Sequence, residues 1–277
     1  MEENYFRLNF PEALFPCNTP EYAHYYNIGA KKKAYSWATP ILFCGLARNC
    51  RKAIELNHRR IQHFQYTTDI NIISNDSTDG TDEYIKDNII GESFTLGVPP
   101  LQGKSLLRRT VMADMRNKYV PYCDHEYEYV VVYDMDIEGG FSYEGFLHSI
   151  GYLEEHPSAG VVTANGIQYR LNEDRSIRDR IFYDTWAYRP LKNKEEDESK
   201  YNLLRFNRGE TPFAVESNFG GMAIYRGSIF NKDNIQYTNE DCDHVTIHKQ
   251  IREMGFKVVL NPSLIVLYSP HYYVNTP

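Results

Sequence analysis

The first half of the chain alternates between short apolar runs and segments with helical periodicity. Four runs are rich in β-branched, aromatic and other apolar residues, and we expect them to form buried strands: 41–47, 70–74, 93–98 and 127–136. Three segments between them carry apolar residues at helical spacing: 49–64, 77–89 and 105–120. Strands that are apolar along their whole length need cover on both faces. The sequence therefore predicts an α/β fold, with a mainly parallel twisted sheet and helices on both of its faces.

The second half of the chain has a different rhythm. We expect a helix over 143–155, a strand over 160–167 and a second helix over 239–255, the last ending at Gly255. The charged stretch 192–200 is typical of a solvated, mobile loop.

The domain organisation follows from the lack of any internal repeat or linker. We expect residues 1–277 to form a single domain. Residues 1–38, rich in Tyr, Pro and Asn, are expected to form an irregular arm. Residues 39–138 and 139–277 would then be two functional halves of this domain.

Charge and hydropathy exclude several classes of protein. The formal net charge is −7, and a nucleic-acid binder would normally present a basic face, so we expect no nucleic-acid partner. No apolar run is long enough to cross a bilayer, and the N-terminus lacks the apolar core of a signal peptide. The five cysteines are scattered without a CxxC pair, as in reduced proteins. These features predict a soluble, cytoplasmic protein without a transmembrane segment.

Two aspartates end the last strand of the first half. Residues 130–138 read VVVYDMDIE, and in an extended chain Asp134 and Asp136 would project from the same side. Neighbouring carboxylates repel each other, and a hard divalent cation removes this cost because oxygen ligands suit Mg²⁺ and Mn²⁺. Such a cation keeps positions open for phosphate oxygens, so an acidic protein could bind a diphosphate there. The alternative is that the two acids only terminate the strand.

A second polar turn follows the strand at 70–74. In the stretch NDSTDGT, Asp76 and Asp79 flank a Ser-Thr pair, and Gly80 can adopt a positive φ. Such a turn presents backbone N–H groups and a carboxylate to a flat polar ligand, for example a nucleobase or a ribose. The alternative is an ordinary strand-to-helix turn in which Thr78 or Asp79 is the N-cap.

Taken in order, the polar motifs resemble those of nucleotide-sugar glycosyltransferases with the GT-A fold. The motifs are GLARN (45–49), NDSTDGTDEY (75–84), MADMRN (112–117), VVVYDMD (130–136), NFGGMAIYR (218–226), NEDCDH (239–244) and SPHYY (269–273). The set is most similar to the broad glycosyltransferase family 2, and YDTWAYR (183–189) adds a likeness to the capsule-associated CAP59-type mannosyltransferases. The resemblance covers roughly residues 40–273. Large DNA viruses encode short soluble enzymes of this shape, and a viral member would act in the host cytoplasm.

The resemblance implies a donor site in the first half of the chain. Ala47 and Arg48 would line the nucleotide pocket, and Asp76 would bind the base or the ribose. Arg116 would reach toward the DMD motif or the diphosphate; the alternative is an arginine on a helix surface.

The resemblance also implies a site for Mn²⁺ or Mg²⁺. Asp134 would lie near the ribose and the metal, Asp136 would be the main metal ligand, and His271 would be a third ligand. Gly220 and Gly221 would let the backbone approach the donor sugar, unless they only form a tight turn.

For the acceptor side, the resemblance implies an inverting reaction on a glycan or glycoconjugate hydroxyl. Asp241 would act as the base, with Glu240 placing the acceptor or supporting Asp241. Tyr183 and Trp186 could stack on sugar rings. We expect a UDP-sugar donor first and a GDP-sugar donor second.

Three other interpretations stay open at this point. A CAP59-like mannosyltransferase could retain the anomeric configuration and would need no such base. A non-catalytic carbohydrate-binding protein would also explain the tyrosines and the acidic site, but not a nucleotide pocket. A zinc site is a weaker possibility: His244 and His248 are spaced i, i+4 near Asp241, but the HExxH motif is absent.

Overall fold

A computed structural model describes residues 10–34, 40–63, 68–101, 103–123, 126–174, 177–192, 194, 197–231 and 235–268. Its α-helices are α2 (Pro20–Ala34), α3 (Arg51–Gln62), α4 (Thr81–Asn88), α5 (Leu106–Tyr119), α6 (Tyr143–Glu155) and α7 (Asp243–Glu253). Its strands are β1 (Ile41–Ala47), β2 (Thr68–Asn75), β3 (Ile90–Phe94), β4 (Tyr129–Tyr133), β5 (Gly140–Phe141), β6 (Ala159–Leu171), β7 (Ile177–Tyr183), β8 (Phe213–Val215), β9 (Met222–Arg226) and β10 (Lys257–Leu267).

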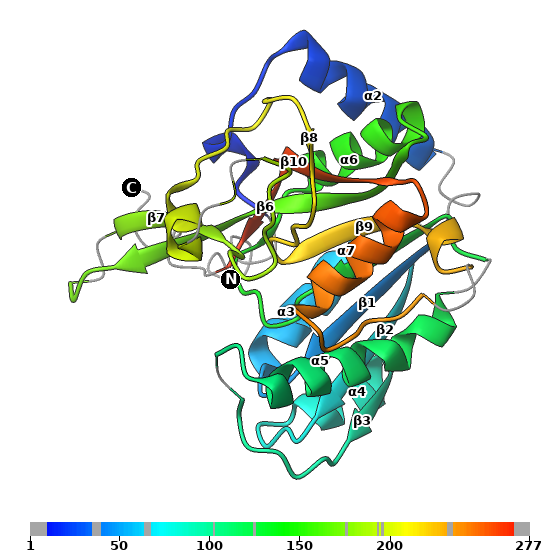
Figure 1. The fold of residues 1–277 in the computed structure, drawn as a ribbon, viewed down its shortest axis with the longest axis vertical. Helices are drawn as coiled ribbons and strands as arrows, with labels where there is room; N and C mark the ends of the chain where they lie inside the picture. Colours follow the sequence, from blue (N-terminus) through cyan, green and yellow to red (C-terminus); the bar gives the residue numbers. More distant parts are fainter. Residues whose placement is uncertain are drawn as a thin grey trace.

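All ten strands belong to one sheet, which runs through both halves of the chain (Figure 1). The order is β3-β2-β1-β4-β9-β6-β10-β5, with β7 paired to β6 and β8 paired to β10. The first four strands are mutually parallel, as the sequence predicted. Beyond β4 the sheet is mixed, because β9 runs antiparallel to both of its neighbours, β4 and β6. The parallel half therefore brings the carboxyl ends of β1, β2 and β4 to one edge.

Strand β1 shows why this sheet needs two layers of helices. Ile41, Phe43 and Ala47 belong to one buried cluster, which also contains side chains of α3 and α6. Leu42 and Cys44 face the opposite cluster, which contains side chains of α5 and α7. Both faces of the strand are thus removed from water, and the prediction of helices on both faces is confirmed.

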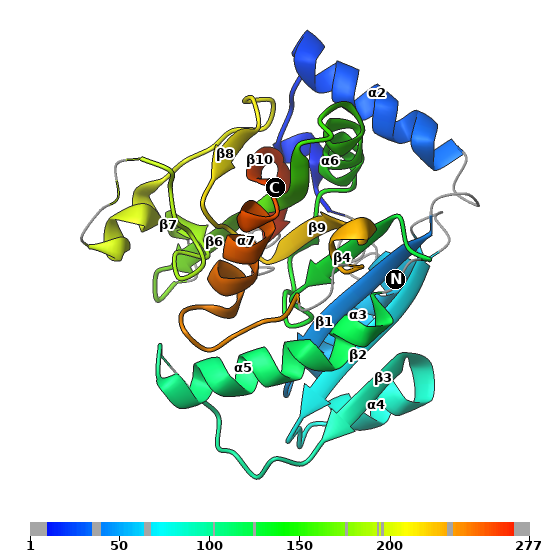
Figure 2. The same cartoon turned by 45° about the vertical axis from the view of Figure 1, so that its right-hand side comes forward.

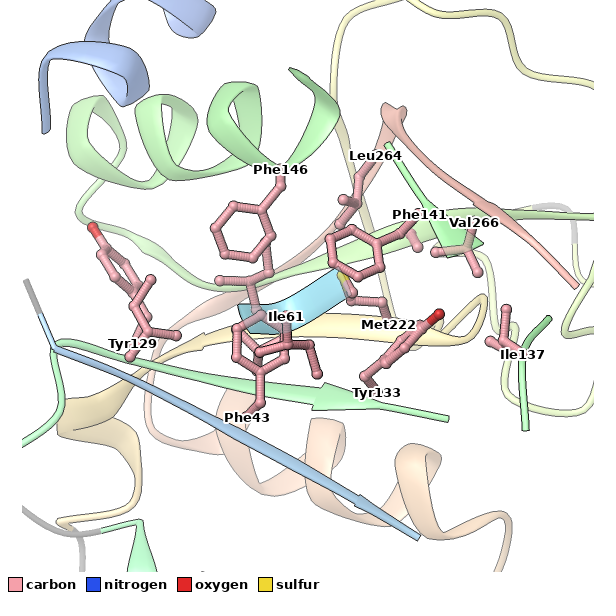
Figure 3. Packing of buried hydrophobic residues seen from close by; sticks show 14 of the residues in the cluster. Phe43, Ile61, Tyr129, Tyr133, Ile137, Phe141, Phe146, Met222, Leu264 and Val266 are labelled. Atoms are coloured by element: carbon pink, nitrogen blue, oxygen red, sulfur yellow. The ribbon is translucent and has the colours of Figure 1, made fainter. Parts of the chain in front are cut away.

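Aromatic side chains fill the cluster on the α3 and α6 face (Figure 3). Phe146 from α6 stacks on Phe43 of β1 with ring centroids 6.2 Å apart. Phe141 meets Tyr133 edge-on at 5.2 Å. Tyr133 is the last residue of β4, so this packing fixes the strand end that carries the DMD motif.

Two predicted strand boundaries were wrong. β3 spans Ile90–Phe94 instead of 93–98, and β4 ends at Tyr133 instead of continuing to 136. Asp134 and Asp136 therefore do not sit on an extended strand. They belong to a turn in which the N–H of Ile137 donates to the carbonyl of Asp134 at 3.3 Å.

The N-terminal arm is not irregular throughout. Residues 20–34 form α2, which lies along α6 on the outside of the molecule (Figure 2). Tyr22 stacks on His148 of α6 at 5.0 Å, and its hydroxyl donates to Glu144 at 3.2 Å. The prediction failed here because these contacts come from aromatic and polar residues without a clear apolar stripe.

Two smaller observations complete the fold. The predicted loop 192–200 overlaps a short 3-10 helix at Glu198–Leu203, and residues 193, 195 and 196 lie outside the described part. Throughout the described ranges, every helix is too short or too polar to cross a bilayer.

Candidate active site

A cavity of about 320 Å³ opens where the parallel strands end. Ala47 and Arg48 line it from the end of β1, Asp134 and Asp136 from the turn after β4, and Tyr183 from the end of β7. Five of the residues predicted from the sequence are thus brought together. Open α/β sheets bind ligands at this edge because the strand ends leave a crevice there.

The two carboxylates of the DMD turn are held in an unfavourable environment. Burial raises the pKa of Asp134 to about 8, against the lowering effect of Arg116, and the neighbouring charge of Asp136 raises it further. Burial also raises the pKa of Asp136. Each carboxylate disfavours the ionised form of the other, so a bound cation would stabilise both.

The Arg116 side chain, from α5, contacts the carboxylate of Asp134. Its guanidinium Nη2 lies 3.5 Å from Oδ1 of Asp134, and its Nε donates a short hydrogen bond to Asp243 at the start of α7. Burial alone would raise the pKa of Asp243, but the charge of Arg116 holds it well below its usual range. Arg116 therefore reaches toward the DMD motif, as predicted. The alternative of an arginine on a helix surface is excluded, because Arg116 is 1% exposed.

Asp76 follows β2 with a positive φ of 49°, and its carboxylate is turned toward the protein's own backbone. Oδ1 accepts from the N–H groups of Leu96 at 2.8 Å and Gly97 at 2.9 Å. Hydrogen bonds from the Asn75 side chain and from this backbone hold the pKa of Asp76 below its ordinary value. Asp76 therefore orders the segment after β3. The sequence did not suggest that its hydrogen-bond partners would come from this segment.

Arg48 also binds the segment after β3. Its guanidinium donates to the carbonyls of Val98 at 2.5 Å and Pro99 at 3.3 Å. The next residues along the chain, Pro100 and Leu101, line the cavity. Arg48 and Asp76 together fix one wall of the cavity, and a contact of Asp76 with a base or ribose remains a prediction.

Gly220 and Gly221 form the turn that precedes β9. Both have positive φ, 63° and 89°, which other residues rarely adopt. The carbonyl of Gly221 accepts from the N–H of Asp134 at 3.1 Å, so this turn anchors the DMD motif. A Cβ on Gly220 would lie 2.2 Å from the carbonyl oxygen of Ala164. The tight-turn interpretation accounts for both glycines, and their approach to a donor sugar is untested.

The predicted base lies outside the residues that line the cavity. Asp241 precedes α7, and its carboxylate forms an ion pair with Arg189 at 3.1 Å. Its Oδ1 also accepts from the N–H of Cys242 at 2.7 Å. Glu240 is exposed, and its carbonyl accepts from Arg109 of α5 at 2.6 Å. Trp186 approaches the cavity through Arg108, whose guanidinium lies 4.7 Å from its ring centroid.

Asp184 is a buried acid that the sequence reasoning missed. It directly follows Tyr183, and its Oδ1 accepts from the N–H of Trp186 at 2.9 Å. Burial raises its pKa to about 6. Its charge also raises the pKa of Asp134, so the two carboxylates share one electrostatic environment. A single acid between aromatic residues gives no spacing signal, although its place at the end of β7 could have been used.

The remaining metal predictions have separate outcomes. His271 lies outside the described residues. Both ring nitrogens of His248 form hydrogen bonds in the core, with the hydroxyls of Ser217 at 2.9 Å and Tyr225 at 3.1 Å, so neither is free to bind a metal. Within the described ranges, no group of three or more His, Cys, Asp or Glu side chains is arranged to hold a metal. Among the described residues, the site offers the Asp134 and Asp136 pair.

Comparisons with known proteins identify the fold. No protein family model and no curated protein matches this sequence. A mannosyltransferase from Pyrobaculum calidifontis, solved in complex with GDP-Man and Mn²⁺, superposes with a TM-score of 0.52 at 13% identity. The match covers 89% of this chain and 66% of that one.

Glucosyl-3-phosphoglycerate synthase from Mycobacterium tuberculosis, in complex with Mn²⁺, UDP-glucose and phosphoglyceric acid, matches with a TM-score of 0.47 at 15% identity. That match covers 91% of this chain and 74% of the other. The mannosyltransferase comparison, together with the sheet topology, confirms the expected GT-A fold. The CAP59 likeness is not shown by any of these matches.

The role of Asp76 can be tested in the protein without ligand. We expect Asp76→Ala to raise amide hydrogen exchange in residues 94–101, because the N–H groups of Leu96 and Gly97 lose their acceptor. Asp76→Asn keeps one acceptor oxygen and should preserve most of the protection. The matched control is Asp79→Ala, which should affect the turn around Thr81 and the start of α3 at Arg51 but not residues 94–101. Unchanged exchange in 94–101 would contradict the assignment.

The Arg116 ion pair makes a separate prediction about stability. Arg116→Met leaves Asp243 buried without its partner, which should cost about 3–5 kcal/mol in the free energy of unfolding. Adding Asp243→Asn should recover a large part of that loss, because the fully buried Asp243 charge is then removed together with its partner. Urea unfolding of the single and double variants measures both values. A loss below about 1 kcal/mol for the single variant would mean that water reaches the site.

Proposed function

We propose that this protein is a metal-dependent glycosyltransferase. It would move a sugar from a nucleotide-sugar donor to a hydroxyl of a glycan or glycoconjugate. The observation that carries the proposal is the DMD turn, which places Asp134 and Asp136 in a cavity at the carboxyl ends of β1 and β4. The GT-A fold and the Mn²⁺ and nucleotide-sugar contents of the similar structures support this assignment.

The residues present fit a divalent cation. Asp134 and Asp136 supply oxygen ligands, and the raised pKa of each shows that their ionised forms lack sufficient compensation from the protein. A bound Mn²⁺ or Mg²⁺ would polarise the leaving nucleoside diphosphate and neutralise a part of its negative charge. Arg116 would keep Asp134 in a fixed orientation during binding, because its other partner, Asp243, is buried.

The donor nucleotide would occupy the space between the DMD turn and the wall built from Pro100 and Leu101. Ala47 at the end of β1 allows close approach, and Arg48 with Asp76 keeps the wall in place. We expect UDP-sugars first and GDP-sugars second.

On the acceptor side, we propose an inverting reaction with Asp241 as the base. Arg189 would orient the Asp241 carboxylate through its ion pair, and Glu240 would support the acceptor. Tyr183, whose ring is tilted against that of Tyr268 with centroids 4.6 Å apart, and Trp186 would contact sugar rings. Asp184 is the other acid near the donor cavity, so it is the natural comparator for Asp241.

Thermal unfolding tests the nucleotide and metal dependence together. We expect UDP or GDP at a hundred times its Kd to add about 2.7 kcal/mol, or roughly 5 °C for a chain of this length, only when Mn²⁺ is present. Asp136→Asn should abolish the shift, and the matched control Asp87→Asn, exposed on α4, should keep it.

The pH dependence of this shift has a defined sign. Folding raises the pKa of Asp134 to about 8, so its stabilising contribution is complete below its unfolded pKa near 4 and is lost as the pH rises through about 8. Mn²⁺ competes with the proton, so its stabilisation should be larger at pH 8 than at pH 6. If no nucleotide stabilises the protein while free glycans do, the non-catalytic alternative is favoured.

The choice of base can be tested once a donor and an acceptor are known. Asp241→Asn should lower kcat by about 100-fold or more and leave the Kd of the donor nearly unchanged, because proton transfer occurs after donor binding. Asp184→Asn should have the smaller effect on kcat. Product NMR should show an inverted anomeric configuration. The reverse order of the two variants would assign the base to Asp184, and a retained configuration would exclude a base mechanism of this kind.

A further inference from the structure

Arg108 is a cation of the cavity to which the motifs assign no role. It lies in the first turn of α5, where its N–H donates to the N-cap Ser105 at 3.2 Å. Its side chain lines the same cavity as Asp134 and Asp136. The guanidinium donates to the carbonyl of Gly103 at 2.9 Å and lies over the Trp186 ring. These contacts hold the charge at the cavity without using a carboxylate.

The electrostatic effects of Arg108 extend across the cavity. Its charge contributes to lowering the pKa of Asp136, of Asp184 and of Tyr268, although burial is the larger effect and raises each of them. Among the described residues, no carboxylate lies within ion-pair distance of Arg108. Arg48, the other arginine of the lining, is already committed to the carbonyls of Val98 and Pro99.

The charge balance of the proposed reaction needs such a group. A divalent cation would offset the charges of Asp134 and Asp136, which leaves the negative charge of a nucleoside diphosphate largely unbalanced. A guanidinium presents several N–H donors in a plane and binds phosphate oxygens by charge-assisted hydrogen bonds. In a partly enclosed cavity such bonds are stronger than at an open surface.

We propose that Arg108 binds the diphosphate of the donor, with Trp186 as the positioning residue that holds the guanidinium in the cavity. The inference rests on the proposed nucleotide-sugar site and names one residue of its diphosphate subsite. It also gives Trp186 a function that does not require an acceptor sugar.

Calorimetric binding of a nucleoside series in the presence of Mn²⁺ tests the assignment. The probes are uridine, UMP and UDP, together with guanosine, GMP and GDP, so that the base and the phosphates are separated. We expect Arg108→Ala to raise the Kd of UDP or GDP by about 10- to 100-fold and the Kd of the corresponding nucleoside by less than 2-fold. Arg108→Lys should lose less diphosphate affinity than Arg108→Ala, because lysine keeps the positive charge and lacks only the planar set of donors. Trp186→Leu should raise the Kd of the phosphorylated ligands only, by several-fold.

The control variant is Arg59→Ala, an arginine 55% exposed on α3 and outside the cavity lining, which should change no affinity. Equal losses for nucleoside and diphosphate would overturn the inference, because Arg108 would then support the base pocket or the fold. An unchanged diphosphate affinity, with or without a raised KM for the acceptor, would also overturn it. If the unaltered protein binds no nucleoside diphosphate at all, the proposed function itself fails, and this inference fails with it.

Discussion

The buried guanidinium of Arg116 connects the three parts of the molecule that form the site. It reaches from α5 to Asp243 at the start of α7 and to Asp134 after β4. Arg116 and Asp243 are buried and Asp134 is half-buried at the cavity, so separating the Arg116–Asp243 pair would carry a high cost. Arg116 and Asp243 therefore link the turn after β4 to the segment that carries Glu240 and Asp241.

The site itself is a region of low intrinsic stability. The carboxylates of Asp134, Asp136 and Asp184 lie in one electrostatic environment, and partial desolvation raises the pKa of each, although Asp134 and Asp184 are only half-buried and Asp136 is exposed. A structure selected only for stability would replace such a group with apolar side chains. This acidic group follows the well-packed strand that ends at Tyr133, and groups with perturbed pKa values often cluster at functional sites.

The sequence predicted the parts of this structure that depend on local pattern. Apolar runs such as Val130–Val132 predict buried strands, and the parallel topology then brings the strand ends at Ala47 and Asp134 to one edge. It did not predict contacts made by irregular segments. The partners of Asp76 lie about 20 residues away, beyond the end of β3, in the run 93–98 that was predicted to be a strand throughout. Helix α2 packs through Tyr22 on His148, and no apolar stripe announces it.

The acidic character of the chain does not oppose binding of a polyanion, because local charge decides the interaction. With a net charge of −7, the long-range field would repel a nucleoside diphosphate, but salt screens that field within about 10 Å. Inside the cavity the relevant charges are the two carboxylates, the cation that they would hold, and Arg108. Overall repulsion would slow the encounter, whereas the cavity charges would determine how long the ligand stays. Affinity and selectivity at the proposed site would therefore depend on the few charged groups that line the cavity, and the surface charge would have little influence on either.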